Sequence, residues 1–430
     1  MAEVFPKRIA LLNTQTNQLQ ALLAAILPAN AFYFRKVEEA GARRRIVNVA
    51  QFQQFPFTHK HELVQDQQEH PPYGTNLTFP LERYVRCHQT SGTSGAPLRW
   101  LDTAESWNWM LGNWEQVLRV AGVTRNDRVL CAFSFGPFLG FWLAYEAALH
   151  LGCLCIPGGG LSSAARLRLI MDQGITVLCC TPTYGIHLAE VAARERVDLS
   201  ASTVRMMIVA GEPGGSIAAT RQRLSDLWPG MRVFDHHGMT ETGPVSFECP
   251  IRAGVLHVIE SGFIPEVIDP QTGSAAATGH AGELVLTSLG RIASPLLRYR
   301  TGDIVKPSPE SICECGRSDL ALEGGILGRT DDMVIIRGVN IFPAAVEEIV
   351  RSIPDIAEYA VTIDESKTMT ELAVRVEPVA QCADVEHVAH VLQSKFEAAW
   401  SLRISVTTVA PGSLPRYELK AKRWTKVKNS

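Results

Sequence analysis

The sequence predicts an α/β protein that contains a layered, mainly parallel sheet, then a β-rich region, then a second and smaller α/β unit. Strand-like apolar stretches alternate with helix-like stretches between residues 128 and 235, as in parallel sheets covered by helices. After Val245, glycine and proline turns separate short strand-like segments, and an α/β pattern returns past Gly328. The 430 residues also exceed what one ordinary core holds.

The part of the chain before residue 128 is predicted to be mixed. Residues 15–50 have the alanine and leucine spacing of helices, and strands are expected at 82–89 and 98–100. Asp102 and Thr103 form a predicted N-cap for a helix that runs to about residue 120, and Gly122 marks its end.

The alternating region follows. Strands are predicted at 128–135, 153–156, 176–180, 205–210 and 232–235, and helices at 141–151, 163–173, 184–194 and 216–228. Ligands bind at loops that follow the carboxyl ends of parallel strands, so the binding residues are expected after these strands.

The remaining segments fall into the β-rich region and the terminal unit. In the β-rich region strands are predicted at 266–268, 282–287 and 296–299. In the terminal unit strands are predicted at 333–336, 358–363, 370–376 and 404–409, and helices at 344–352 and 385–399. The two regions meet near residue 328, where a domain boundary is expected.

Composition excludes several classes of protein. Hydrophobic residues make up 46% and charged residues 20%, as in a globular enzyme, and the net charge of −3 argues against a nucleic-acid partner. The most apolar region, 129–160, is interrupted by glycine and proline, so we expect no membrane span. The first residues lack the pattern of a secretory signal, and most of the ten cysteines lie in apolar runs, which favours a cytoplasmic location.

A loop rich in small residues follows the strand predicted at 82–89. Six of the eight residues from Thr90 to Pro97 are glycine, serine or threonine. Such a loop brings backbone N–H groups and hydroxyls close to a phosphate chain. It is not a Walker loop, because Gly95 is followed by Ala96 and Pro97 rather than by Lys and Ser or Thr. A surface turn is the alternative.

A second polar segment follows the strand predicted at 232–235. His237 can offer a flat ring to a base, Thr240 a hydroxyl to a phosphate, and Glu241 a carboxylate to a cation, since Mg²⁺ prefers oxygen ligands. The alternative is a helix N-cap at Thr240 or Thr242.

Three further segments carry charge. Asp303 follows a glycine turn, where a carboxylate can accept both hydroxyls of a ribose, and an Asx turn is the alternative. Residues 328–332 lie where the pattern of the chain changes, which suits a hinge. Residues 414–423 are basic and, taken alone, are typical of a solvated end.

Taken together, in this order and spacing, these segments resemble the acyl- and aryl-adenylate-forming ligases over almost the whole chain. The resemblance is closest to the phenylacetate–coenzyme A ligase-like branch, on residues 32–35, 40–41, 55–60 and 328–343. It implies a large N-terminal adenylate-forming domain with several subdomains over 1–327. It also implies a small mobile C-terminal α/β domain over 328–430, with the hinge near 329–332.

The resemblance implies a role for each matched residue. Lys420 and Thr240 would stabilise charge at the α-phosphate, Glu241 would hold Mg²⁺, and Asp331 would be the pivot of the hinge. The residues that would bind the nucleotide are Ser91, Gly92, Thr93, Ser94, Gly95, Gly211, Glu212, Pro213, Asp235, His236, His237, Gly238, Asp303 and Arg329. The sequence departs from the family pattern at Ala96, His237 and Leu419, where Lys, Tyr and Gly are commoner.

The implied reaction has two steps. A carboxylic acid attacks ATP to give an acyl adenylate and pyrophosphate, and the thiol of coenzyme A then takes the acyl group while the C-terminal domain rotates. An acyl carrier protein or an amine is the alternative acceptor, and a lapsed ligase that only senses its ligands is the non-enzyme alternative. A homodimer is suggested by the branch alone.

The acid is expected beside the strand end at 210–213. Its proposed contacts are Phe135, Phe138, Tyr184, Ala210, Gly211 and His237. Aromatic walls favour a flat, ring-sized acid such as phenylacetate, benzoate or anthranilate over a fatty tail. Each of the three aromatic residues can equally be plain core.

Finally, Cys249, His257, Cys313 and Cys315 offer three thiolates and an imidazole, which is a tetrahedral zinc set. The spacing is not that of a standard finger, but similar clusters belong to some members of the resembled branch. With four protein ligands the Zn²⁺ would be structural.

Overall fold

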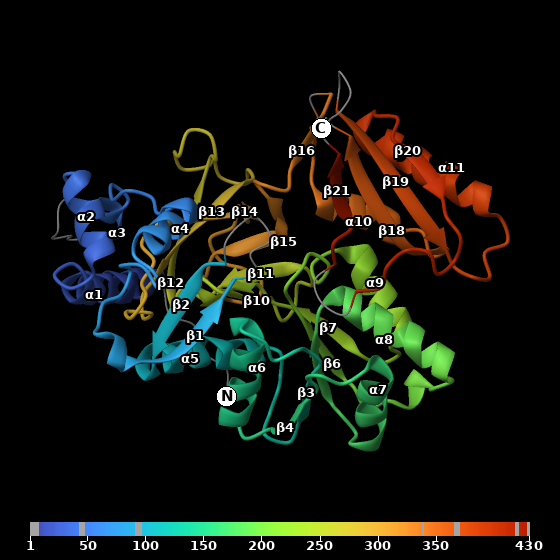
Figure 1. The fold of residues 1–430 in the computed structure, drawn as a ribbon, viewed down its shortest axis with the longest axis horizontal. Helices are drawn as coiled ribbons and strands as arrows, with labels where there is room; N and C mark the ends of the chain where they lie inside the picture. The colour runs from blue at the N-terminus through green and yellow to red at the C-terminus, as the bar shows by residue number, and fades with distance from the viewer. Residues whose placement is uncertain are drawn as a thin grey trace.

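The computed structural model describes residues 8–42, 48–90, 97–337, 339–364, 370–417 and 421–427. It has a large N-terminal part and a smaller C-terminal unit, drawn in orange and red (Figure 1). No helix in the described ranges combines the length and the hydropathy that crossing a membrane requires.

Helices begin the chain, as predicted for residues 15–50, but they are separate. They are α1 (Arg8–Ile26), α2 (Ala31–Glu39), α3 (Val49–Phe52) and α4 (Lys60–Glu69). Asn30 starts α2 by accepting a hydrogen bond from the Tyr33 N–H at 3.1 Å. Buried leucines of α1 share a core with Trp100 and Tyr299, so these helices pack against strands far along the chain.

A hairpin and a long helix follow. The predicted strand at 82–89 is a short 3₁₀ turn, η1 (Leu81–Arg83), followed by β1 (Tyr84–Gln89), which pairs with β2 (Arg99–Thr103). The predicted N-cap is confirmed at Thr103, whose hydroxyl accepts from the Ser106 N–H at the start of α5 (Ala104–Val120).

The parallel sheet is confirmed, with strand order β4-β3-β5-β6-β7. Its elements are β3 (Arg128–Cys131), α6 (Leu139–His150), β4 (Leu154–Pro157), α7 (Ser163–Asp172), β5 (Val177–Cys180), α8 (Pro182–Glu195), η2 (Leu199–Ala201), β6 (Met206–Val209), α9 (Ala218–Leu227) and β7 (Arg232–Asp235). The first strand is shorter than the predicted 128–135, because its neighbour β4 ends at Pro157, which is paired with Cys131.

A six-stranded antiparallel sheet, β10-β11-β15-β14-β13-β12, forms the β-rich region. Its strands are β10 (Ser246–Glu248), β11 (Val255–Val258), β12 (Phe263–Ile268), β13 (Gly282–Ser288), β14 (Tyr299–Pro307) and β15 (Ala321–Arg329). Three were not predicted: β10, β11 and β15. Gly324 and Gly325 give β15 the sequence of a turn, and both have positive φ. The strand predicted at 296–299 was misplaced, since β14 begins at Tyr299.

The C-terminal unit has its own apolar core. A small hairpin of β16 (Val334–Ile336) and β17 (Val339–Ile341) leads to α10 (Pro343–Arg351). A four-stranded sheet, β20-β19-β18-β21, follows. Its elements are β18 (Ile356–Asp364), β19 (Glu371–Pro378), α11 (Val385–Trp400), β20 (Ser405–Thr408) and β21 (Trp424–Val427). The last strand was not predicted, and it lies parallel to β18.

Candidate active site

A cavity of about 590 Å³ lies between the N-terminal part and the C-terminal unit. Asp331 and the C-terminal residues Glu347, Tyr359 and Arg423 lie on its surface. Its lining also includes every predicted nucleotide-binding residue that the structure describes: Gly211, Glu212, Pro213, Asp235, His236, His237, Gly238, Asp303 and Arg329. The predicted residues Ser91, Gly92, Thr93, Ser94, Gly95 and Lys420 lie outside the described residues.

These residues meet because two sheets end at the same place. The loop that begins at Ala210 follows β6, and the histidines follow β7, so both leave the carboxyl edge of the parallel sheet. Asp303 lies in β14 and Arg329 ends β15, and the two residues are paired in the antiparallel sheet. Gly211 has a φ of 92°, a left-handed conformation that favours glycine.

Asp303 holds its two neighbours in place. Its carboxylate accepts from His237 Nε2 at 3.0 Å and from Arg329 Nη1 at 3.0 Å. Its own N–H donates to the Thr301 hydroxyl at 3.0 Å. Gly302 precedes Asp303 with a φ of 77°, and a Cβ there would lie 3.0 Å from the Arg329 guanidinium. Carboxylate, imidazole and guanidinium therefore form one polar group on the cavity wall.

The segment with Thr240 and Glu241 is a tight turn between two short paired strands, β8 (Gly238–Met239) and β9 (Gly243–Pro244). No helix follows in the described chain from 239 to 262, so the N-cap alternative is wrong. The turn directly follows Gly238 and Met239, which line the cavity.

A buried ion pair supports this turn. Arg291 Nη1 donates to the carbonyl oxygens of Thr240 and Glu241, each at 2.8 Å. Its other nitrogens bind Asp102, with distances of 2.7 Å from Nε and 2.5 Å from Nη2. Both charged side chains are fully buried. No local sequence pattern indicates this pair, because 189 residues separate its members.

Lys60 was also missed as a site residue, although it ends the segment 55–60 that carried part of the resemblance. It begins α4, and its ammonium lies 3.1 Å from Glu241 Oε1. The Glu241 side chain is only 8% exposed, so its carboxylate pairs with the Lys60 ammonium where little water reaches it. This observation fits the predicted role of Glu241 as a Mg²⁺ ligand.

Asp235 and His236 are buried at the end of β7. Burial raises the pKa of the Asp235 carboxyl to about 6, and the Ser216 hydroxyl donates to it. Burial lowers the pKa of His236 to about 4, so the imidazole is neutral at pH 7. Its Nδ1 donates to the Ser246 carbonyl oxygen at 2.8 Å, and its ring lies 4.3 Å from that of Trp114. The cavity wall at β7 therefore has a neutral imidazole at His236 beside a carboxyl group at Asp235 whose pKa is raised.

The predicted aromatic contacts of the acid lie elsewhere. Phe135, Phe138 and Tyr184 are absent from the described lining of the cavity. Phe135 packs edge-on against Trp142, with ring centroids 5.0 Å apart. Tyr184 is 1% exposed, and its hydroxyl accepts from Arg166 at 2.6 Å. Tyr184 agrees with the core alternative, whereas Phe135 and Phe138 are half-buried, and the role of all three residues in acid binding stays a prediction.

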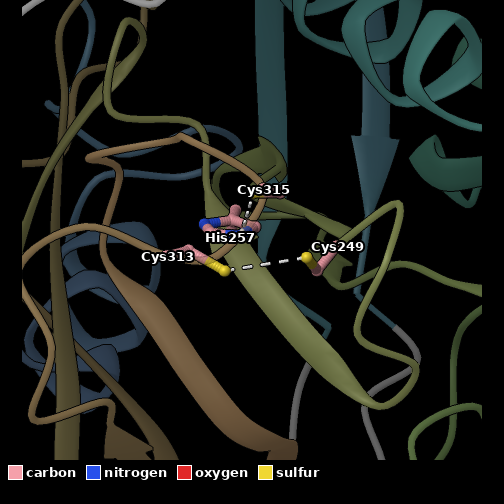
Figure 2. A group of neighbouring side chains, drawn as sticks. All are labelled: Cys249, His257, Cys313 and Cys315. Atoms are coloured by element: carbon pink, nitrogen blue, oxygen red, sulfur yellow. Dashed lines mark hydrogen bonds between the residues drawn. The ribbon is translucent and has the colours of Figure 1, made fainter.

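The four predicted zinc ligands lie together at one end of the antiparallel sheet (Figure 2). Cys249 follows β10, His257 belongs to β11, and Cys313 and Cys315 precede β15. All four ligand atoms lie within 4.8 Å of one another. Cys249 Sγ lies 3.8 Å from Cys313 Sγ, and Cys315 Sγ lies 3.4 Å from His257 Nε2. His257 Nδ1 donates to the Asp319 carbonyl, which leaves Nε2 with its lone pair toward the thiols.

Two family models match the chain. Residues 32–291 match the model of AMP-binding enzymes, and residues 338–427 match that of the AMP-binding enzyme C-terminal domain. The chain belongs to the AMP-binding enzyme family. The resemblance inferred from the sequence is therefore confirmed.

Two relatives that match over most of both chains are phenylacetate-coenzyme A ligases. The phenylacetate-coenzyme A ligase of Thermus thermophilus is 31% identical over 94% of this chain and 93% of its own. That of Escherichia coli is 30% identical over 96% of this chain and 94% of its own.

A solved relative also shares the arrangement of the two parts. 2-Hydroxyisobutyryl-CoA ligase in its postadenylation state, with R3-HIB-AMP, is 27% identical. It superimposes with a TM-score of 0.90 over 96% of this chain and 89% of its own. The same enzyme in its thioesterification state superimposes over 98% of this chain and 91% of its own, with a TM-score of only 0.70. The fold class is confirmed, and the C-terminal unit lies as in the postadenylation state.

Replacing Arg291 tests the support of the Thr240–Glu241 turn. Arg291→Met should lower the free energy of unfolding by about 3–5 kcal/mol, because Asp102 would stay buried as an unpaired charge. Urea unfolding followed by tryptophan fluorescence measures the change.

Arg83→Met is the control, since the Arg83–Glu105 pair is exposed and should contribute less than about 1 kcal/mol. Replacing both charges, in the double variant Asp102→Leu/Arg291→Met, should recover part of the lost free energy of unfolding. If Arg291→Met unfolds no more easily than the control, the buried pair does not support the turn.

Proposed function

We propose that this protein activates an aromatic carboxylic acid with ATP as an acyl adenylate and then transfers the acyl group to coenzyme A. The products would be an aryl-coenzyme A thioester, AMP and pyrophosphate. One observation carries the proposal. In a chain of the AMP-binding family, similar over most of its length to phenylacetate-coenzyme A ligases, every predicted nucleotide-binding residue that the structure describes lines one cavity.

The first step needs the nucleotide held still and its charge balanced. The Asp303 carboxylate, fixed between His237 and Arg329, would accept the ribose hydroxyls. A carboxylate oxygen of the acid attacks the α-phosphorus, and the bond from that phosphorus to the bridging oxygen of pyrophosphate breaks. The Thr240 hydroxyl and the Lys420 ammonium would stabilise the charge, and Glu241 would hold the Mg²⁺ that accompanies ATP.

The second step needs a different face of the C-terminal domain. The thiol sulfur of coenzyme A attacks the carbonyl carbon of the mixed anhydride, and AMP leaves. We infer that the C-terminal domain rotates about residues 329–332 between the steps. Arg329 Nε donates to the Asp331 carboxylate at 2.9 Å, and Arg329 Nη1 donates to Asp303. Arg329 would therefore connect the hinge to the nucleotide site.

The identity of the acid is the finer part of the proposal. The sequence-level relatives are phenylacetate-coenzyme A ligases, and the close structural neighbour acts on a small branched hydroxy acid. An aromatic acid is favoured by the 30–31% identity over nearly the full chain. Carrier-protein or amine acceptors, a homodimer and a cytoplasmic location stay predictions.

A panel of acids tests the proposed reaction. Pyrophosphate release from ATP and Mg²⁺ should occur with phenylacetate, benzoate or anthranilate, and thioester should appear when coenzyme A is added. The same assay includes 2-hydroxyisobutyrate and a fatty acid. Release without thioester would indicate a carrier-protein or amine acceptor. No release with any acid would contradict the ligase assignment.

Lys420 separates the two steps. Lys420→Ala should slow pyrophosphate release by about 10²–10³-fold, the effect of removing one electrostatic stabiliser. Thioester formation from added aryl adenylate and coenzyme A should be unchanged, because this step does not need the ammonium. Lys395→Ala, exposed on α11, is the control and should leave both steps unchanged. Normal adenylation by Lys420→Ala would favour the sensor alternative.

We also propose that Cys249, His257, Cys313 and Cys315 hold a structural Zn²⁺. The four ligand atoms suit a tetrahedral ion, and the Asp319 carbonyl orients the imidazole. All four positions would come from the protein, so the ion would join β10, β11 and the segment before β15 without taking part in the reaction.

Metal analysis tests the zinc proposal. The purified protein should contain about one zinc ion per chain, the content of a four-ligand structural site. Cys313→Ser should lose the zinc and unfold at a lower temperature, whereas Cys382→Ser, in the C-terminal unit, should do neither. Wild-type protein that carries no zinc and unfolds at the same temperature with or without added zinc would contradict the proposal.

A further inference from the structure

The C-terminal unit contacts the N-terminal part through residues on both sides of Lys420. In Figure 1 this unit stands above α8 and α9. Three residues of the C-terminal unit donate hydrogen bonds to the N-terminal part: Arg416, Ala421 and Arg423. Their acceptors lie on α8 or in the loop after β6. These contacts join the segment that carries the predicted catalytic lysine to one edge of the cavity.

Glu212 makes the central contact. Its Oε2 accepts from the Ala421 N–H at 2.9 Å, and its Oε1 accepts from the Thr183 N–H at 2.8 Å. Thr183 lies in the first turn of α8, where backbone N–H groups have no partner within the helix and the helix dipole favours an anion. One carboxylate therefore fixes a helix start in the N-terminal part and a backbone N–H of the C-terminal unit.

Two side chains flank this contact. Arg423 donates to the Thr183 hydroxyl from both terminal nitrogens at 3.3 Å, and Glu358 binds the same guanidinium at 2.7 Å. Arg416 Nε donates to Glu190 on α8 at 3.1 Å. The other nitrogens of Arg416 bind Glu377 within the C-terminal unit. Glutamates of the C-terminal unit therefore hold both arginines in place. The acceptors of these arginines in the N-terminal part are Glu190 and Thr183.

We propose that Glu212 is a positioning residue that holds the C-terminal domain in the adenylate-forming arrangement. This inference rests on the proposed function. Both carboxylate oxygens of Glu212 bind protein N–H groups, so the side chain joins the two parts of the chain at the edge of the cavity. Ala421 directly follows Lys420, and consecutive Cα atoms are about 3.8 Å apart, so fixing the Ala421 N–H limits where the lysine can reach.

The contact stabilises only one of the two arrangements. Its donor belongs to the C-terminal unit and its acceptor to the N-terminal part, and the present arrangement matches the postadenylation state of the solved relative rather than its thioesterification state. Rotation of the domain between the steps separates donor from acceptor. A bond present in one state shifts the equilibrium toward that state and favours the step performed there.

Glu212→Gln tests the inference, because the amide keeps the shape of the side chain but loses its charge and one acceptor. The turnover rate of pyrophosphate release should fall about tenfold, the effect of a weakened charge-assisted hydrogen bond, with little change in KM for ATP. Thioester formation from added acyl adenylate and coenzyme A should not slow. Glu190 lies on α8 outside the cavity lining, and Glu190→Gln should show a smaller change of the same kind. Glu195 is exposed at the end of α8, and Glu195→Gln should show no change.

Amide hydrogen exchange provides a readout without substrate. Exchange in residues 421–427 should be faster in Glu212→Gln than in wild type, whereas Glu195→Gln should match wild type. Equal slowing of both half-reactions, a change confined to KM for ATP, or unchanged exchange would overturn the inference. Wild-type protein that forms no adenylate with any acid would contradict the proposed function instead, and the exchange data would still decide whether Glu212 holds Ala421.

Discussion

The fully buried ion pair between Asp102 and Arg291 joins the segments on which the site depends. Asp102 lies in β2, Arg291 follows β13, and the Arg291 guanidinium also binds the carbonyls of Thr240 and Glu241. Removing two charges from water is costly, so such a pair persists only where its geometry satisfies most of the donors. Here it locks the β1–β2 hairpin, the antiparallel sheet and the Thr-Glu turn to one another.

The cavity then follows from how the two sheets meet. Loops leave the carboxyl edge of the parallel sheet and face β14 and β15, so His237 after β7 reaches the Asp303 carboxylate of the antiparallel sheet. The contact of His237 and Arg329 with Asp303 joins the parallel sheet, the antiparallel sheet and the start of the hinge. A nucleotide in this cavity would therefore touch residues whose positions are fixed from both sheets, which favours a preorganised site.

The face of the C-terminal unit that meets the cavity carries a cluster of buried charges around Glu347 and Arg423. Burial raises the pKa of Glu347, but Arg423 and Arg351 outweigh it and lower the pKa to about 2, so the carboxylate is ionised at neutral pH. Arg351 and Arg423 also bind Glu358. A domain that docks through ion pairs and hydrogen bonds can separate without exposing a large apolar surface to water. Such an interface suits the domain rotation proposed above.

The sequence by itself determined the alternating helices and strands of 128–235, the N-cap at Thr103, the family, and the grouping of Asp303, Arg329 and the two histidines in one site. These depend on local periodicity, capping and short motifs, which are written in neighbouring residues. Only the tertiary structure decided the pairing of Arg291 with Asp102, of Lys60 with Glu241, and of Glu212 with Ala421, and the interior position of Tyr184. It also decided that β15 is a strand despite its glycines, because its pairing with β11 joins segments that are distant in sequence. Long-range contacts leave no periodic signal in a single chain, so the folded arrangement alone could show them.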